Sequence, residues 1–135
     1  MAKTRAPRPA DTTTDAAPRP RTPRLPKTVA AAVNAMRDKK ALDIVVLDLR
    51  KTSGFTDFFV ICSGTNSRQI QTIADEVGMQ LKKLGEMPTS VEGHKNAEWI
   101  LMDYGDYVVH VFSDHARGYY DIERLWRDAT EVPLT

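Results

Sequence analysis

The sequence is poor in features that cross-link a chain, anchor it in a membrane or export it. It has a single cysteine, which excludes an intrachain disulfide framework. This residue, Cys62, stands in the apolar run 58–62, where we expect a buried and unreactive thiol. No apolar run approaches the roughly 18 residues that cross a membrane, and the N-terminus lacks the apolar segment of a secretory signal. We therefore expect a soluble, cytoplasmic protein.

Bulky apolar residues are nearly missing from the start of the chain. Residues 1–27 contain no Ile, Val, Phe, Tyr or Trp, but they hold six of the eight prolines. Such a segment buries too little surface to offset the entropy lost on ordering. We therefore predict a disordered Pro/Arg-rich tail, followed by one domain over residues 28–135. An organellar transit peptide is the alternative, because the segment is rich in Arg and Thr, although its prolines oppose an amphipathic helix.

Charge is divided unevenly between the two parts of the 135-residue chain. Seven basic and two acidic side chains give residues 1–27 a net charge of +5, which leaves −4 for the domain. An acidic domain is poorly suited to holding nucleic acid, since the phosphates need Lys and Arg to neutralise them. It is better suited to a basic protein partner, whereas the basic tail is suited to phosphates.

Hydrophobic periodicity predicts an α/β domain with the element order α-β-β-α-β-β-β-α. A first helix is expected over 28 to about 40, with Thr28 as its cap. A second is expected over about 66–84, with its cap at Thr65, Asn66 or Ser67. A third is expected over about 114–129, with its cap at Ser113 or Asp114. The apolar stripes of the last two are Ile70, Ile73, Ala74, Val77, Leu81 and Leu84, then Ile122, Leu125, Trp126 and Ala129. Strands are expected over 43–49, 58–62, 90–92, 98–104 and 106–112. The order implies a mixed sheet with helices packed mainly on one side.

The last two strands are predicted to form a hairpin with its turn at Tyr104-Gly105. This places Asp103 opposite Asp106 and Trp99 opposite His110. Alternation then sorts the side chains onto two faces. The first face carries Ile100, Met102, Tyr107, Val109 and Val111, and it should pack against the helices. The second face carries Trp99, Leu101, Asp103, Asp106, Val108, His110 and Phe112.

The second face combines an apolar centre with an acidic tip. Glu92 and Glu98 add negative charge close to it. Either a second layer or the tail covers this face, or it is a docking surface of the kind that protein interfaces prefer. Trp99 distinguishes the two hypotheses, because a core tryptophan supports the fold whereas an interface tryptophan supports binding.

We find no complete catalytic or metal-binding motif. The turn Ser63-Gly64-Thr65 precedes a helix, but it lacks the spacing of a P-loop or a dinucleotide fingerprint, so an anion role has weak support. The three histidines have neither the spacing nor the cysteine partners of a zinc site. Asp103 and Asp106 would be screened by water at a hairpin tip, which disfavours acid–base catalysis by this pair. The sequence therefore predicts no catalytic residue, no metal and no cofactor.

A series of short motifs runs from about residue 28 to residue 130. They are Thr56-Asp57, Ile61-Cys62-Ser63-Gly64-Thr65 with Arg68, Ile73-Ala74-Asp75, Glu92-Gly93, Ala97-Glu98-Trp99, Asp103-x-Gly105-Asp106, His110-Val111-Phe112, and Arg117 with Tyr120, Glu123, Leu125 and Trp126. In this order they resemble the ribosomal silencing factor family, also called Iojap or RsfS. The tail lies outside the resemblance.

The resemblance implies a nucleotidyltransferase-like fold without its catalytic residues, in agreement with the lack of an Asp-x-Asp pair after Ser63-Gly64. It further implies a non-enzymatic protein that binds the large-subunit protein uL14, blocks association of the 50S and 30S subunits and represses translation when nutrients are scarce. It implies a homodimer when free. The tail lies outside the resemblance, but its basic charge suggests that it reaches rRNA phosphates. The expected uL14 contact comprises Trp99, Glu98, Leu101, Asp103, Asp106, Val108, His110 and Glu92.

Two alternative functions stay open. An active nucleotidyltransferase would need a metal-binding carboxylate pair near Ser63-Gly64, which the local sequence does not supply. A large-subunit assembly factor that helps to place uL14 would use the same contact as a silencing factor, so the sequence does not separate these two.

Overall fold

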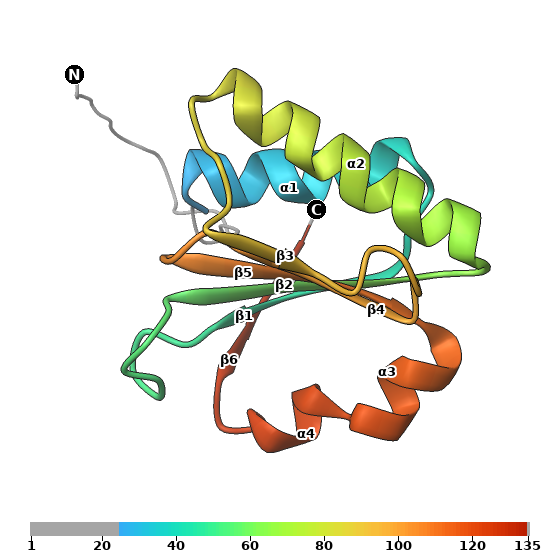
Figure 1. Ribbon diagram of the computed structural model, residues 1–135. Coiled ribbons are helices and arrows are strands. Elements are labelled where there is room, and N and C mark those ends of the chain that lie inside the picture. Colours follow the sequence, from blue (N-terminus) through green and yellow to red (C-terminus); the bar gives the residue numbers. More distant parts are fainter. Residues whose placement is uncertain (1–24, 135) are drawn as a thin grey trace, which may run out of the picture.

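The computed structural model describes residues 25–134 and consists of a six-stranded sheet between two helical layers (Figure 1). Two long helices, α1 (Lys27–Asp38) and α2 (Ser67–Lys83), cover one face of the sheet. The short helices α3 (Asp114–Tyr120) and α4 (Ile122–Leu125) lie on the other. The predicted α/β domain with most of its helical residues on one side is therefore confirmed. Of the predicted tail, residues 1–24 lie outside the described part, while Leu25 packs against the core.

The sheet is mixed, as predicted. Its strands are β1 (Leu42–Asp48), β2 (Phe58–Gly64), β3 (Ser90–Glu92), β4 (Trp99–Asp103), β5 (Tyr107–Ser113) and β6 (Thr130–Val132), in the order β3-β4-β5-β2-β1-β6. Strands β2 and β5 pair in parallel and all other neighbours are antiparallel. All seven residues of β2 are buried, as its unbroken apolar run indicates. Strand β6, which has three residues, is absent from the predicted order.

The main core lies between the first face of the sheet and the two long helices. The helices contribute Val29, Val33, Met36, Ile70, Ile73, Ala74, Val77 and Leu81, and the hairpin contributes Ile100, Met102, Tyr107, Val109 and Val111. The predicted stripe of α2 and the predicted first face of the hairpin are confirmed, except that Leu84 is 39% exposed because α2 has already ended at Lys83. Gly85 follows with φ +84, the left-handed conformation expected of a residue that terminates a helix.

The helix caps were predicted correctly for two helices out of three. The Asn66 side chain accepts from the backbone of Gln69 at 2.8 Å and starts α2, and Ser113 Oγ accepts from the Ala116 N–H at 3.0 Å and starts α3. Thr28 does not cap α1, which begins one residue earlier without a side-chain cap. Pro26 occupies the cap position, and its ring restricts the backbone there.

The predicted register of the β4–β5 hairpin is wrong by two residues. Trp99 pairs with Phe112 rather than with His110. Because side chains alternate with a period of two, this shift leaves every strand residue on its predicted face, whereas Asp106 lies in the turn.

The turn itself explains the shift. Its two central residues are Gly105 and Asp106, since the Tyr104 N–H donates to the Tyr107 carbonyl at 3.0 Å. Gly105 has φ +88, and its N–H donates to Asp103 Oδ1 at 2.8 Å. A side-chain acceptor two residues before a backbone donor is a common turn contact, and it moves the turn one residue along the chain from the predicted Tyr104-Gly105.

The predicted third helix is broken in two. Asp121 adopts the left-handed conformation, with φ 48 and ψ 50, between α3 and α4. Ile122 is buried as expected, whereas Leu125 is 76% exposed, because the break rotates the rest of the helix. Trp126 and Ala129 still pack partly buried against the second face, before the chain enters β6.

We predict that Ile100→Ala lowers the free energy of unfolding by about 2–5 kcal/mol, because Ile100 is fully buried. Val91→Ala is the matched control, since Val91 lies on the same face but on the edge strand and is 45% exposed. Its cost should stay below about 1 kcal/mol. Urea unfolding at equilibrium measures both, and equal losses would show that the first face is assigned wrongly.

Candidate partner-binding face

The second face of the sheet carries a row of aromatic rings, part of which α3 and α4 cover. Trp99 stacks on Phe112 with ring centroids 5.0 Å apart, and Tyr120 of α3 lies 4.8 Å from Trp99. Further along the sheet, Phe59 meets Trp126 edge to face at 5.8 Å. A second layer thus covers the β5-β2-β1 part of this face. The β3–β4 part, which we call the open part of the second face, keeps half-buried and exposed side chains.

His110 is a buried, uncharged acceptor for the Trp99 indole. It is 3% exposed, and its Nδ1 accepts from Trp99 Nε1 at 3.0 Å. Burial lowers the pKa of His110 to about 3, because an imidazolium would lose its hydration there. Since Nδ1 accepts, the proton sits on Nε2, which has no hydrogen-bond partner among residues 25–134. The histidine therefore fixes the orientation of the tryptophan ring.

The structure brings together the eight residues that were predicted to contact a partner, but at different depths. Glu92, Leu101 and His110 lie side by side on β3, β4 and β5. The exposed members are Glu92, Glu98 and Asp106, the half-buried ones are Trp99, Leu101 and Asp103, and the buried ones are Val108 and His110. The last two therefore lie beneath the surface that a partner would meet, and they support it from below.

The loop before β4 depends on a glycine whose role the sequence did not reveal. Gly93 has φ +83, and a Cβ built on it would lie 2.0 Å from the Trp99 carbonyl oxygen. The loop is also tied to α2, because His94 Nε2 lies 2.8 Å from Asp75 Oδ1 and Gln71 Nε2 donates to the His94 carbonyl at 2.8 Å. The glycine at the end of a short strand was the available signal, since glycine adopts the left-handed conformation more readily than other residues.

Arg117 holds the second layer on the sheet. Its Nη1 donates to Ser63 Oγ at 2.9 Å and to the Asp43 carbonyl at 2.7 Å. Its Nε and Nη2 donate to the two carboxylate oxygens of Glu123 at 2.9 and 3.1 Å. From the sequence alone, the acidic and basic side chains of residues 117–128 are expected to form surface pairs within one helix. Instead, the Arg117 side chain is 13% exposed, and its pair with Glu123 spans the helix break.

The turn after β2 is filled by the chain's own side chains. Gln69 Oε1 accepts from the N–H and the hydroxyl of Thr65, at 2.7 and 2.9 Å. A Cβ on Gly64 would lie 2.7 Å from Ile70 Cγ1, so this glycine is needed for the packing of α2 on β2. The amides and the glycine that suggested an anion site therefore have structural roles.

Groups that could bind a metal ion or act as a nucleophile also occur in the described part of the chain, residues 25–134. Among residues 25–134, no group of three or more His, Cys, Asp or Glu side chains is placed to hold a metal ion. Burial raises the pKa of the Cys62 thiol to about 12, the direction that opposes a nucleophile. None of the helices in residues 25–134 is long and apolar enough to cross a membrane.

Comparison with known proteins agrees with this arrangement. A sequence profile described as "Ribosomal silencing factor during starvation" matches residues 22–135. The chain belongs to the ribosomal silencing factor family. It is 45% identical over 103 residues to ribosomal silencing factor RsfS of Halalkalibacterium halodurans, covering 76% of this chain and 88% of that protein.

Two further relatives of this family member are informative. A crystal structure of a protein from Chromobacterium violaceum superposes with a TM-score of 0.72 at 38% identity, over 74% of this chain and 83% of that one. A mouse protein named "Mitochondrial assembly of ribosomal large subunit protein 1" is 30% identical over 97 residues, which are 70% of this chain and 42% of the mouse protein.

Several of the motifs that carried the family resemblance meet on the second face, whereas the motif 73–75 belongs to α2 and packs on the first face. Gly93 approaches the Trp99 carbonyl, Trp99 donates to His110, and Tyr120 of α3 lies against Trp99. In this family member, part of the motif set therefore gathers on one surface.

We predict that Gly93→Ala lowers the free energy of unfolding by at least about 2 kcal/mol, since the left-handed backbone alone costs 1–2 kcal/mol and the new methyl would meet the Trp99 carbonyl. Gly105→Ala is the matched control, because it shares a positive φ but has no atom within 4 Å of its Cβ position. It should cost about 1 kcal/mol. Thermal or urea unfolding compares them, and equal costs would contradict the close approach at Gly93.

We predict that protonation of His110 weakens the fold at acidic pH. The pKa in the folded chain lies below its ordinary value of 6.5, so the unfolded chain binds the proton first as the pH falls. The stabilising effect is complete above pH 6.5 and is lost progressively towards pH 3. On going from pH 7 to pH 5, the resistance of His110 to protonation should lower the free energy of unfolding by about 2 kcal/mol.

The control for this pH effect is His110→Phe, which cannot titrate. Urea unfolding gives the free energy of unfolding of the original chain minus that of His110→Phe. This difference should fall by about 2 kcal/mol on going from pH 7 to pH 5. A constant difference would show that His110 does not resist protonation in the folded chain.

Proposed function

We propose that the chain binds the large-subunit protein uL14 through the open part of the second face, and that it thereby blocks association of the 50S and 30S subunits. The observation that carries this proposal is the half-buried pair Trp99 and Leu101, bordered by the carboxylates of Glu92, Glu98, Asp103 and Asp106, which we call the acidic rim. An apolar centre inside a polar border is the usual anatomy of a protein interface. Repression of translation would follow from occupying the joining surface, without a catalytic step.

The acidic rim supports a basic partner. The side-chain ion pairs formed among residues 25–134 use other carboxylates, such as Glu123 with Arg117 and Asp48 with Arg50. The rim charges therefore remain available to attract a positively charged surface, which raises the association rate and makes binding weaken as salt rises. The basic residues of the segment 1–27 would add contacts to rRNA phosphates.

Two properties of the free protein belong to the same proposal. We infer a homodimer in the absence of ribosomes, in which the exposed apolar part of the second face is shared between two copies. The protein would act in the cytoplasm, where free 50S subunits are present.

An assembly factor for the large subunit is the second candidate. The name of the mouse relative states such a role for that protein. A silencing factor has to bind mature 50S subunits and prevent their joining, whereas an assembly factor has to bind incomplete particles. Mixing the purified chain with mature 50S and 30S subunits therefore separates the two.

We predict that the full chain co-sediments with 50S but not with 30S subunits in a sucrose gradient, and that it reduces the 70S peak on mixing. Glu92→Lys should weaken 50S binding about tenfold, because it places a positive charge in the acidic rim. Glu131→Lys is the matched control, with the same change of charge on β6 at the opposite edge of the sheet. Equal binding to both subunits, or an unchanged 70S peak, would contradict the proposal.

A further inference from the structure

A small hollow lies beside the acidic rim, where β4 begins and α3 starts. It measures about 180 Å³ and is lined by Glu98, His115, Ala116, Tyr119 and Tyr120. Tyr119 is 74% exposed and Tyr120 49% exposed. Two neighbouring aromatic rings this open to water are unusual at the end of a short helix, since such surface is normally buried against another part of the chain or against a partner.

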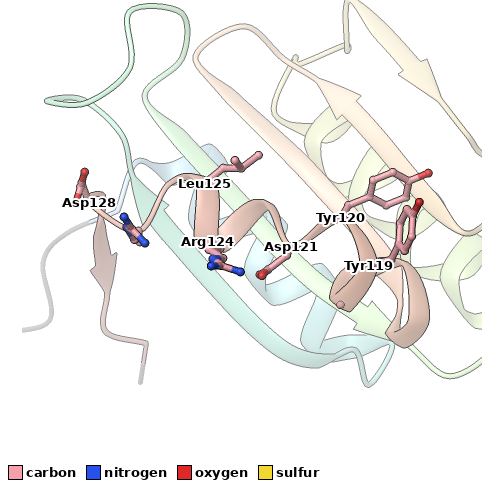
Figure 2. A pocket seen from close by; sticks show the side chains of 8 residues that line it. Tyr119, Tyr120, Asp121, Arg124, Leu125 and Asp128 are labelled. Carbon is pink, nitrogen blue, oxygen red and sulfur yellow. The ribbon is translucent and has the colours of Figure 1, made fainter.

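The rings around the hollow are arranged at right angles. The Tyr119 and Tyr120 rings meet at 5.0 Å with an interplanar angle of 89°, and both project from the end of α3 (Figure 2). His115 stacks on Tyr119 at 6.1 Å, and Trp99 holds Tyr120 at 4.8 Å. Both rings line the hollow, and a cation placed over the face of either ring would be attracted, because the face carries the negative part of the ring quadrupole.

A carboxylate completes the hollow. Glu98 is exposed, and its Oε1 accepts from Ser113 Oγ at 2.8 Å, which fixes the position of the group at the hollow. Within the described residues no cationic side chain forms an ion pair with Glu98. Arg117 of α3 instead pairs with Glu123. The hollow is therefore negatively charged, with a position for a positive group between the rings and the carboxylate.

The wider hollow on the outer side of α3 and α4 differs in charge. It is bordered by the same two tyrosines and by Leu125, but Arg124 and Arg127 alternate there with Asp121 and Asp128 (Figure 2). These opposite charges compensate one another, so of these two hollows the one at Glu98 selects for the sign of a ligand.

We propose that the hollow at Glu98 binds one arginine side chain of a basic protein, with the guanidinium against the Tyr119 and Tyr120 rings and hydrogen-bonded to the Glu98 carboxylate. Arginine fits better than lysine, because its planar group stacks on rings and donates two parallel hydrogen bonds. RNA fits poorly, since its phosphates would be repelled by Glu98. This inference deepens the proposed function, in that the arginine would come from the same basic partner.

The experiment uses the full ¹⁵N-labelled chain and two capped tripeptides, Gly-Arg-Gly and its citrulline analogue, which is uncharged but has nearly the same shape. The arginine peptide should shift the amide resonances of residues 113–120 and the Trp99 indole at concentrations where the citrulline peptide does not. Glu98→Gln should weaken arginine binding about tenfold, because the amide can still accept from Ser113 but carries no charge. Tyr119→Ala should weaken it to a similar extent.

Matched controls for these variants lie elsewhere on the surface. Glu131→Gln removes the same charge from β6, and Leu125→Ala removes an exposed apolar side chain from α4. Neither should alter binding of the arginine peptide. Equal shifts with both peptides, an unchanged affinity in Glu98→Gln, or shifts at the same residues with hexauridine instead of the arginine peptide would each overturn the inference.

Sedimentation with 50S subunits separates this inference from the proposed function. If the chain selects the arginine peptide through Glu98 but does not bind 50S, the proposed function fails and the arginine site stands. The opposite result is that the chain binds 50S, that Glu98→Gln binds 50S equally well, and that the chain does not distinguish the two peptides. In that case the arginine site fails while the proposed function stands.

Discussion

The second face of this domain depends on one guanidinium group. Arg117 distributes its hydrogen bonds over β1, β2 and α4, through the Asp43 carbonyl, Ser63 and Glu123. A half-buried arginine is stable only when its donors are satisfied, and removing any partner leaves a charged group poorly solvated. These hydrogen bonds fix the position of α3 relative to the sheet. Because Tyr120 belongs to α3, they also hold its ring against Trp99. The candidate partner-binding face thus depends on a polar contact that joins α3 to the sheet.

The parts of the fold that were predictable are those governed by a local period. The stripe from Ile70 to Leu81 follows the helical repeat, and the separation of Ile100 from Trp99 follows strand alternation. The hairpin shows why such predictions are robust. A two-residue error in register leaves both faces intact, whereas an error of one residue would have exchanged them. The strand residues of the second face were therefore grouped correctly, although their strand partners were not.

Features that depend on contacts between distant segments escaped prediction. The helix break at Asp121 aligns Glu123 with Arg117, and nothing in the local sequence requires it. The depth of the candidate residues was equally hidden. Alternation assigns His110 and Leu101 to the same face, but only the packing of Phe59 and Trp99 around His110 makes the histidine buried and neutral. Sequence patterns give the direction of a side chain, while its accessibility depends on what other elements place over it.

The shortness of β3 and β6 has a consequence for how this sheet meets other molecules. Both edge strands have three residues, so each edge offers few unpaired backbone groups to an incoming strand. Such short edges are poor templates for a partner that extends the sheet, a mode of recognition that reads mainly the backbone and tolerates many sequences. Under the proposed function, recognition then depends on side chains of the sheet surface. Side-chain recognition favours one folded partner over the many extended segments of unfolded chains.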